Sequence, residues 1–140
     1  MNPLALTVRQ YMTPDPITVE PEESLMRALE LMRLRNIHRI PVVSAGALVG
    51  ILVEGDLKRA EPSMLSDSQE HFNKVMEETP ISRIMIRNPM TIGPDASLLE
   101  VVETLYGTKY GGLPVVDDGK VVGIVTRNDM LRALIEVLRG

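Results

Sequence analysis

The sequence GGLPVVDDGKVVGIVTRND, residues 111–129, carries the strongest structural signal in this chain. Two short apolar runs, 113–116 and 121–125, flank Asp118-Gly119. Asp-Gly between apolar runs is typical of a tight hairpin turn, so the stretch predicts two short buried strands. A helix is expected directly after them, because apolar residues then recur at helical spacing up to the C-terminus. These residues are Met130, Leu131, Leu134, Ile135 and Leu138.

A second copy of this stretch lies at residues 38–56, HRIPVVSAGALVGILVEGD. The likeness extends further, since residues 8–60 align without a gap on residues 81–133, at a constant offset of 73 positions (81 − 8). Two copies are too few for a solenoid, so we expect them to pack together about a pseudo-two-fold axis. Identical pairs include Met12/Met85, Pro16/Pro89, Thr18/Thr91, Ser24/Ser97, Pro41/Pro114, Gly46/Gly119, Gly50/Gly123 and Asp56/Asp129.

Each copy also carries an amphipathic helix ahead of its hairpin. Apolar residues fall at i, i+3, i+4 and i+7, which is one face of a helix. Ser24 and Ser97 stand just before these faces as expected N-caps. Each copy therefore has the predicted order β-α-β-β-α, and the fold class is α/β (α+β). The face consists of Leu25, Ala28, Leu29 and Met32 in copy one, and of Leu98, Val101, Val102 and Leu105 in copy two.

The predicted organisation is a single module over residues 1–140. Its first motif spans 8–60, a connecting segment spans 61–80, and the second motif spans 81–134. The connecting segment is polar, and we expect a short helix over residues 67–76. Nothing in it indicates chemistry.

The composition limits the function classes. A net charge of −4 and only three tyrosines and one phenylalanine argue against nucleic-acid binding, which needs basic patches or stacking platforms. The chain has no cysteine, so neither disulfides nor thiolate metal sites are available, and a reducing compartment is the simpler assumption. No apolar run approaches a membrane span, and the N-terminus does not resemble a signal peptide. We therefore expect a soluble cytoplasmic protein.

The sequence also lacks the usual parts of a catalytic site. It contains no Gly-rich phosphate loop, no Ser/His/Asp set and no His pair at helical spacing. We therefore expect no catalytic residue, no metal site and no enzymatic cofactor.

Three motifs of the repeat resemble the CBS motif. They are Met12-x-x-x-Pro16-x-Thr18 at its start, Pro41-Val42-Val43 in its middle and GIVTRND, residues 123–129, at its end. Two such motifs form a Bateman module, and the long linker is similar to that of the acetoin-utilisation accessory proteins. The resemblance implies two clefts between the motifs that bind AMP, ADP, ATP or S-adenosylmethionine. It also implies a homodimer that regulates an enzyme, channel or transporter and is not itself an enzyme.

The resemblance further implies that ribose is bound by a hydroxyl and a carboxylate three residues apart. Copy two has both, as Thr126 and Asp129, whereas copy one keeps Asp56 but has Val53 in place of the hydroxyl. A carboxylate can accept both hydroxyls of a cis-diol. The same Thr-x-x-Asp spacing is also close to a helix capping box, which needs no ligand, so both interpretations stay open.

Phosphate groups, by the same resemblance, are bound by a His-Arg pair ahead of the Pro-Val motif. Copy one has His38 and Arg39, and copy two has Gly111 and Gly112 there. The cleft of Thr126 would then face His38 and Arg39, which gives one good nucleotide site per chain. The alternative is an ordinary polar strand edge with Arg39 solvated or paired to a carboxylate.

The adenine ring is expected in an apolar slot formed by residues 88–91, residues 110–114 and Ile124. Side chains of these types are more often core residues than ligand contacts. A ligand-free structural dimer and an S-adenosylmethionine sensor remain the alternative functions. The full implied set is Thr126, Asp129, Arg127, His38, Arg39, Asn88, Met90, Thr91, Tyr110, Gly111, Gly112, Leu113, Pro114 and Ile124, with Asp56 and Thr18 in a weaker second cleft.

Overall fold

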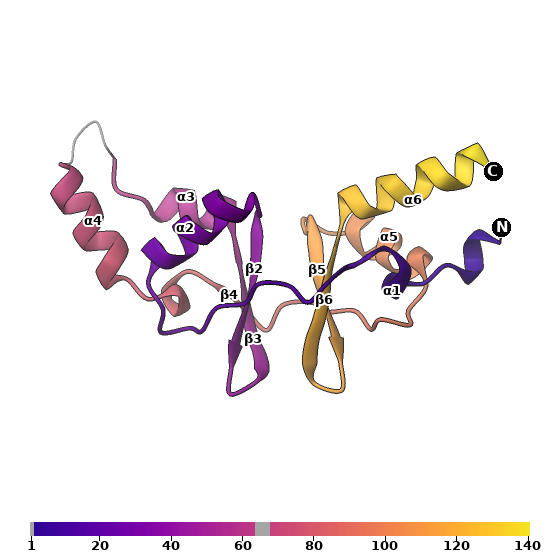
Figure 1. Ribbon diagram of the computed structural model, residues 1–140, viewed down its shortest axis with the longest axis horizontal. Helices are drawn as coiled ribbons and strands as arrows, with labels where there is room; N and C mark the ends of the chain where they lie inside the picture. The colour runs from indigo at the N-terminus through magenta and orange to yellow at the C-terminus, as the bar shows by residue number, and fades with distance from the viewer. Residues whose placement is uncertain (1, 64–67) are drawn as a thin grey trace. The chain divides into compact units, whose positions relative to one another are not determined.

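The structure, a computed structural model, describes residues 2–63 and 68–140 and divides into two compact units. The central unit is Ile17–Asn88, and the terminal unit joins the residues up to Pro16 with Pro89–Gly140. Each unit contains a three-stranded antiparallel sheet with helices packed against it (Figure 1). The predicted α/β fold class is confirmed.

The central unit has the strand order β2-β3-β4, and helix α2 supplies much of its core. The predicted apolar face of α2 is buried, from Leu25 at 0% exposed to Leu29 at 8%. The predicted N-cap is confirmed, because Ser24 Oγ accepts the N–H of Arg27 at 3.1 Å. The elements are α2 (Leu25–Arg35), β2 (Arg39–Ser44), β3 (Ala47–Val53), α3 (Glu54–Ala60), α4 (Gln69–Glu78), the 3-10 helix η2 (Ile81–Arg83) and β4 (Ile86–Arg87).

The terminal unit has the strand order β1-β6-β5, with α5 as the counterpart of α2. Ser97 Oγ caps α5 as predicted, by accepting the N–H of Glu100 at 3.2 Å. The predicted apolar face of α5 is buried except at Val102, which is 45% exposed. The elements are the 3-10 helix η1 (Pro3–Ala5), α1 (Val8–Tyr11), β1 (Thr13–Pro14), α5 (Leu98–Tyr106), β5 (Gly112–Asp117), β6 (Lys120–Thr126) and α6 (Arg127–Arg139).

Both hairpins have the tight two-residue turn that the sequence predicts. The turn residues are Asp118 and Gly119 in the terminal unit and Ala45 and Gly46 in the central unit. All have positive φ, 51° and 79° in the first turn and 50° and 81° in the second, as a type I′ turn requires. Aspartate tolerates this conformation, whereas alanine does not favour it, so Ala45 is the strained residue of the four.

The first strand of each repeat belongs to the sheet of the other repeat. β1, from copy one, pairs with β6 of copy two at Pro14↔Gly123. β4, from copy two, pairs with β3 of copy one at Gly50↔Arg87. The compact units therefore do not follow the repeat boundaries 8–60 and 81–134, because each unit takes its outer short strand from the other copy.

Two equivalent glycines allow these pairings. A Cβ at Gly123 would lie 3.0 Å from the carbonyl oxygen of Thr13, and one at Gly50 would lie 2.9 Å from the carbonyl oxygen of Ile86. Backbone atoms cannot yield as a flexible side chain can. Glycine at both positions is therefore explained by the close approach of the exchanged strand.

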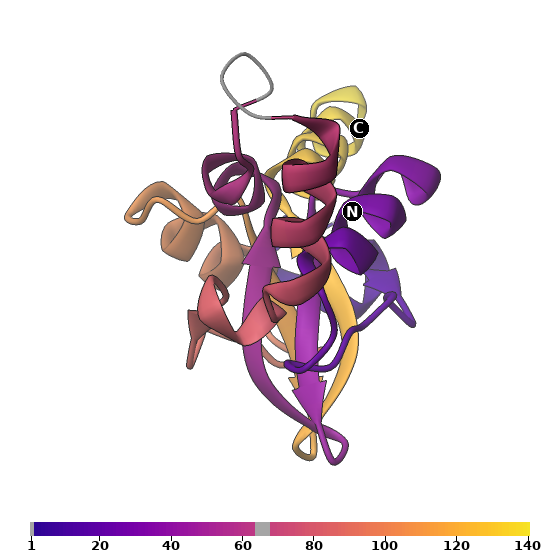
Figure 2. The same cartoon turned by 90° about the vertical axis from the view of Figure 1, so that its left-hand side faces the viewer.

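The connecting segment forms α4, close to the helix predicted over residues 67–76, of which Asp67 lies outside the described residues. α4 packs against α2, and Figure 2 shows it running across the front of the central unit. Phe72 is 8% exposed and Met76 is fully buried. The segment thus covers an apolar side of the central unit, a role that its polar composition did not indicate.

The helices are short. α6 is the longest in the described part of the chain, with 13 residues. No helix among the described residues is both long and apolar enough to cross a membrane. The expected cytoplasmic location stays a prediction.

Candidate functional site

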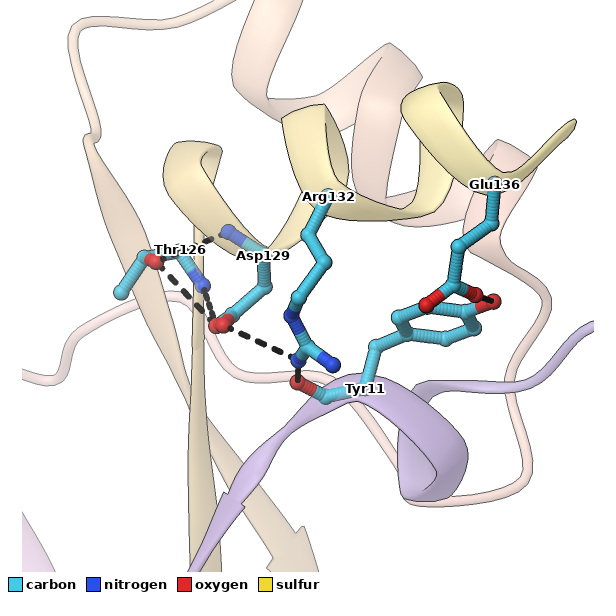
Figure 3. A network of polar contacts seen from close by, with 5 residues as sticks. All are labelled: Tyr11, Thr126, Asp129, Arg132 and Glu136. Atoms are coloured by element: carbon cyan, nitrogen blue, oxygen red, sulfur yellow. Dashed lines mark hydrogen bonds and ion pairs between the residues drawn. The ribbon is translucent and has the colours of Figure 1, made fainter. Parts of the chain in front are cut away.

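Thr126 and Asp129, the expected ribose-binding pair, stand where β6 ends and α6 begins (Figure 3). Thr126 Oγ1 accepts the N–H of Asp129 at 3.3 Å, and the N–H of Thr126 donates to Asp129 Oδ2 at 2.8 Å. The Thr126 hydroxyl also donates to Asp129 Oδ2 at 3.1 Å. These reciprocal bonds form a capping box. The capping interpretation is confirmed, so any ligand has to share these two side chains with the helix.

The second carboxylate oxygen of Asp129 faces Arg132. The distance from Asp129 Oδ1 to Arg132 Nη2 is 3.5 Å, and the Asp129 side chain is 15% exposed. A carboxylate offers about four lone-pair positions, and the capping box and Arg132 use only part of them. Asp129 can therefore accept further hydrogen bonds from outside the protein.

Arg132 continues into a longer polar network (Figure 3). Its Nη2 donates to the carbonyl oxygen of Tyr11 at 2.8 Å, and its guanidinium carbon lies 5.2 Å from the centre of the Tyr11 ring. The Tyr11 hydroxyl donates to Glu136 Oε2. This hydrogen bond, followed by burial, raises the pKa of Tyr11 above its ordinary value of 10.0. The network fixes α1 to α6.

Sequence reasoning missed Tyr11, Arg132 and Glu136. Helical spacing could have indicated two of them, because Arg132 and Glu136 follow Asp129 by three and seven positions and share its face of α6. Tyr11 gave no signal, since its bond to Glu136 joins residues 125 positions apart.

Arg127, another expected nucleotide contact, bonds to carbonyl oxygens at the C-terminal end of α5 in this structure. Its Nη2 donates to the carbonyl oxygen of Leu105 at 2.6 Å and lies 3.4 Å from that of Thr108. A cation at the C-terminal carbonyls of a helix stabilises it through the helix dipole. A nucleotide contact by Arg127 stays a prediction.

The expected adenine-binding strand lies beside Thr126. Gly112, at the start of β5, pairs with Thr126, and the carbonyl oxygen of Gly111 accepts the N–H of Arg127 at 3.0 Å. Leu113 is 1% exposed, so its side chain is a core residue and only its backbone could reach a ligand. The structure thus brings together these five expected residues: Tyr110, Gly111, Gly112, Leu113 and Thr126.

Pro114 and Ile124 pair with each other deeper in the same two strands. Ile124 also pairs with Thr13 of β1 and is 9% exposed, so its side chain belongs to the packed interior. Both residues stay candidates through their backbone more than through their side chains.

The segment 88–91 is divided between the units. Asn88, with φ of 48°, ends the central unit, whereas Met90 and Thr91 belong to the terminal unit and are exposed. Thr91 lines a shallow hollow of about 440 Å³ beside α5, together with the carboxylate-bearing residues Glu100 and Glu103. Their predicted contact with adenine is untested.

His38 and Arg39, the expected phosphate ligands, lie in the central unit. His38 Nδ1 is 2.9 Å from Glu54 Oε2, and Glu54 also forms an ion pair with Lys58 at 3.1 Å. Contact with His38, then with Lys58, lowers the pKa of the Glu54 carboxyl below its ordinary 4.5. Arg39 is the half-buried first residue of β2 and pairs with Val53. Their role in phosphate binding stays a prediction of the sequence.

The second expected site lacks the arrangement of the first. Val53 is the N-cap of α3 and makes no side-chain cap bond. Asp56 forms an ion pair with Arg59, and its side chain is 26% exposed. Thr18 is exposed in the same unit. The expectation of a weaker second site agrees with the missing hydroxyl but is not tested by it.

Where copy two places Arg127 against the end of α5, copy one leaves a hollow. Glu54 occupies the matching position, and a cavity of about 370 Å³ opens between α2 and α3. The repeats therefore differ in charge at this position, and they differ in hydrogen bonding at the helix N-cap. The lining residues are Leu29, Met32, Arg33, Asn36, Glu54, Leu57, Lys58 and Glu61.

Comparison with known families accounts for both repeats. The family model "CBS domain" matches residues 8–63 and 81–136. The chain belongs to the CBS-domain family. Both expected CBS motifs are thus recognised, and the chain is a tandem CBS pair.

Solved structures of CBS pairs resemble this one over nearly its whole length. A candidate acetoin utilization protein (AcuB) from Vibrio cholerae is 31% identical, with a TM-score of 0.78, over 97% of this chain and 95% of that one. The predicted similarity to acetoin-utilisation proteins is confirmed. CBSX2 of Arabidopsis thaliana, solved in complex with AMP, is 30% identical, with a TM-score of 0.78, over 94% and 98% of the two chains.

A third structure extends the range of ligands. The CBS domain pair of the protein MJ0100, in complex with 5′-methylthioadenosine and S-adenosyl-L-methionine, is 30% identical, with a TM-score of 0.79, over 95% and 98% of the two chains. CBSX2 and the MJ0100 pair thus bind adenosine-containing ligands of different charge. A ligand-binding regulatory module is the function that the comparison supports for this CBS pair.

Proposed function

We propose that this CBS pair senses an adenine nucleotide, AMP, ADP or ATP, and that Thr126 and Asp129 bind its ribose. The observation that carries the proposal is the Asp129 carboxylate, which keeps lone pairs that the capping box and Arg132 do not use. It lies in the first turn of α6, after Thr126, which pairs with Gly112 of β5. Glycines leave the backbone open to close approach by a ligand. AMP, 5′-methylthioadenosine and S-adenosylmethionine, the ligands of the related structures, share an adenosine group.

Ribose binding has to compete with the capping box. The two ribose hydroxyls would donate to the Asp129 carboxylate, whose Oδ2 already accepts from Thr126. A cap of this kind contributes about 1 kcal/mol, whereas hydrogen bonds to a charged acceptor contribute about 1.5–3 kcal/mol each. Two such bonds outweigh a partly lost cap, so one carboxylate can serve both purposes.

The number of phosphates would be set by other residues. We keep the sequence prediction that His38 and Arg39 bind phosphate, because a guanidinium can donate hydrogen bonds to two phosphate oxygens at once. Arg39→Gln should then weaken AMP binding while leaving 5′-methylthioadenosine, which has no phosphate, unaffected. Equal loss for both ligands would contradict a phosphate role for Arg39.

In this proposal the ligand acts as a signal and undergoes no reaction. Occupancy biases the surface that the module offers to a regulated enzyme, channel or transporter. The strength of such a switch cannot exceed the difference in ligand affinity between the two states. S-adenosylmethionine is the alternative ligand. A ligand-free structural dimer is the second candidate function, favoured by a capping box that is complete without any ligand.

We further propose that the module forms a homodimer through α5 and α6. In the central unit α4 packs against α2, whereas in the terminal unit α5 packs against α6, and both of these helices keep exposed apolar side chains. Large apolar side chains that stay exposed on neighbouring helices favour an interface with another chain. The exposed side chains on these two helices are Leu99 (51%), Val102 (45%), Tyr106 (82%), Leu131 (57%), Leu134 (50%), Ile135 (49%) and Leu138 (76%).

Sedimentation equilibrium tests the dimer. The double variant Leu131→Glu, Leu134→Glu should convert a dimer to a monomer, because it places charges within the apolar patch. Leu34→Glu is the matched control, since Leu34 is 79% exposed at the end of α2 in the other unit. A wild-type protein that is monomeric at all concentrations would remove this part of the proposal.

Thermal unfolding with added ligands tests the sensor. AMP, ADP, ATP, S-adenosylmethionine and GTP are each added at the same concentration to wild type, Asp129→Asn and Asp56→Asn. A ligand that binds only the folded state at 100 times its Kd stabilises it by about 2.7 kcal/mol, which shifts the midpoint measurably. We expect a shift with an adenosine ligand but not with GTP, lost in Asp129→Asn and kept in Asp56→Asn. No shift with any ligand would favour the structural dimer.

A further inference from the structure

The polar network that begins at Asp129 ends on the N-terminal segment of the chain (Figure 3). Arg132 lies between Asp129 Oδ1 and the carbonyl oxygen of Tyr11, over the Tyr11 ring. Glu136 holds the Tyr11 hydroxyl. The orientation of Asp129 therefore depends on residues that lie outside the Thr-x-x-Asp pair.

We infer that Arg132 is a positioning residue for the ribose site, and that it links ligand binding to the docking of residues 7–12 on α6. This inference rests on the proposed function, because it assumes that Asp129 accepts the ribose hydroxyls. It adds a mechanism by which occupancy of the site is communicated to another part of the chain.

The geometry around Arg132 supports the positioning role. The hydrogen bond to Tyr11 and the ring beneath the guanidinium fix Arg132 independently of Asp129. Its distance to Asp129 Oδ1, 3.5 Å, is long compared with the roughly 2.7–2.9 Å of a charge-assisted hydrogen bond. A carboxylate that is partly released from Thr126 by a ribose can close this gap, so its contact with Arg132 strengthens when ligand binds.

The same contacts explain the link to the N-terminal segment. Arg132 Nη2 contacts both the Asp129 carboxylate and the carbonyl oxygen of Tyr11. A shift of the guanidinium therefore changes its hydrogen bond to α1. α1 is otherwise attached by backbone bonds such as the N–H of Val8 to the carbonyl oxygen of Ala96 at 3.0 Å. Coupling between two sites is reciprocal. A ligand that strengthens the contacts of Arg132 therefore also stabilises the docking of α1 on α6, and a change that loosens α1 lowers the affinity for the ligand.

Copy one provides an internal control. It keeps the acid and the arginine as Asp56 and Arg59, which form an ion pair. In the central unit, Ile84 and Ser63 stand at the positions that Tyr11 and Glu136 hold in the terminal unit. The central unit therefore has neither the ring nor the carboxylate of the network. The Arg59 side chain is 72% exposed, against 53% for Arg132. The network is thus specific to the terminal unit, which also has the Thr126 hydroxyl.

The first readout is discrimination between ribose and deoxyribose. Calorimetric Kd values are measured for AMP and 2′-deoxy-AMP, and for 5′-methylthioadenosine and its 2′-deoxy form, on wild type, Arg132→Gln, Arg132→Lys and Arg59→Gln. We expect Arg132→Gln to raise the Kd of the ribose ligand about tenfold, within the usual range of coupling effects. The variant should also reduce the ratio by which the ribose ligand binds more tightly than the deoxy ligand. Arg132→Lys should restore part of the advantage, and Arg59→Gln should change nothing. A merely structural role would weaken both sugars equally.

The second readout is amide hydrogen exchange over residues 8–12, with and without the ribose ligand that binds. Ligand should slow exchange of these amides in wild type and not in Arg132→Gln. Tyr11→Phe keeps the ring and removes only the hydrogen bond from the hydroxyl to Glu136, so ligand should protect these amides to an intermediate degree. If Arg132→Gln does not fold, Tyr11→Phe still tests the coupling.

The outcomes separate this inference from the proposed function. A wild type that binds none of these ligands overturns both. A wild type that binds with ribose preference, together with an Arg132→Gln variant of unchanged preference and unchanged protection of residues 8–12, overturns the inference alone.

Discussion

The two repeats share a backbone but end their hairpins differently. In copy two the chain leaves β6 at Thr126, whose hydroxyl and Asp129 cap α6 reciprocally. In copy one it leaves β3 at Val53, which makes no cap bond, and Asp56 pairs with Arg59 instead. The conserved backbone therefore does not by itself create a site. A single side chain at the N-cap decides whether the carboxylate three residues later is held in a capping box.

A second difference concerns the residue that starts each final helix. Arg127 binds the carbonyl oxygen of Leu105 at the end of α5, whereas Glu54 binds His38 and Lys58 and leaves a cavity beside α2. The two copies of a duplicated unit can thus keep one backbone and still form different local contacts at equivalent positions. The following predictions break or sharpen this comparison.

The largest expected effect concerns the feature that the repeats share. Gly50→Ala and Gly123→Ala should each destabilise the protein by about 1–3 kcal/mol, because the added Cβ meets a backbone oxygen of the exchanged strand. Urea unfolding measures the loss. Gly93→Ala is the control, since nothing lies within 4 Å of a Cβ there. If all three variants were equally stable, the pairings of β1 and β4 would be wrong.

Exchanging the N-caps tests the main difference between the repeats. Thr126→Val should cost about 1 kcal/mol of stability by removing the capping hydroxyl, and Val53→Thr should add a similar amount. Val53 already has the extended backbone of an N-cap, with φ of −107° and ψ of 147°. Urea midpoints of the two variants and of the double variant measure both effects. If Val53→Thr is no more stable than wild type, the Asp56 carboxylate stays paired with Arg59 and does not form a capping box with Thr at position 53.

The hairpin turns should respond in opposite directions. Ala45→Asn should stabilise the protein by about 0.5–1 kcal/mol, because asparagine tolerates the positive φ that alanine disfavours. Asp118→Ala, at the matching position of copy two, should lower the free energy of unfolding by a similar amount. Thermal midpoints check both changes, and a destabilised Ala45→Asn would contradict the turn type assigned to copy one.

The smallest expected effect is a pH dependence confined to copy one. His38 and then Lys58 lower the pKa of Glu54 below 4.5, so the carboxylate stabilises the fold above that pH, and this contribution is lost as the pH falls through the folded-state pKa. Because the group is partly exposed, we expect less than about 1 kcal/mol. Unfolding free energies near pH 6 and pH 3.5 should fall less steeply for Glu54→Gln than for wild type. Arg127→Gln, at the matching position of copy two, should leave the slope unchanged.

The ribose pair shows how far sequence reasoning reached at the site. The spacing of Thr126 and Asp129 indicated a capping box, and the resemblance to the CBS motif implied a ribose site there. The structure confirms the capping box. Leu113 and Ile124 were expected near adenine, and the side chains of both are buried. Leu113 packs in the core with Val125, and Ile124 lies in the central strand of its sheet, paired on both sides. The roles of His38, Arg39 and the segment 88–91 in ligand binding stay predictions.

The sequence alone determined the elements of this protein and their local geometry. The repeat, the amphipathic helices, the caps at Ser24 and Ser97 and the two-residue turns all depend on neighbours within a few positions, where propensity and periodicity act. Tertiary structure decided which copy each first strand joins, that α4 covers α2, and that Tyr11 meets Arg132. Both copies carry the same strand motif, so local pattern cannot choose between partners. That choice depends on contacts between residues far apart in the chain, which form only when the whole core is assembled.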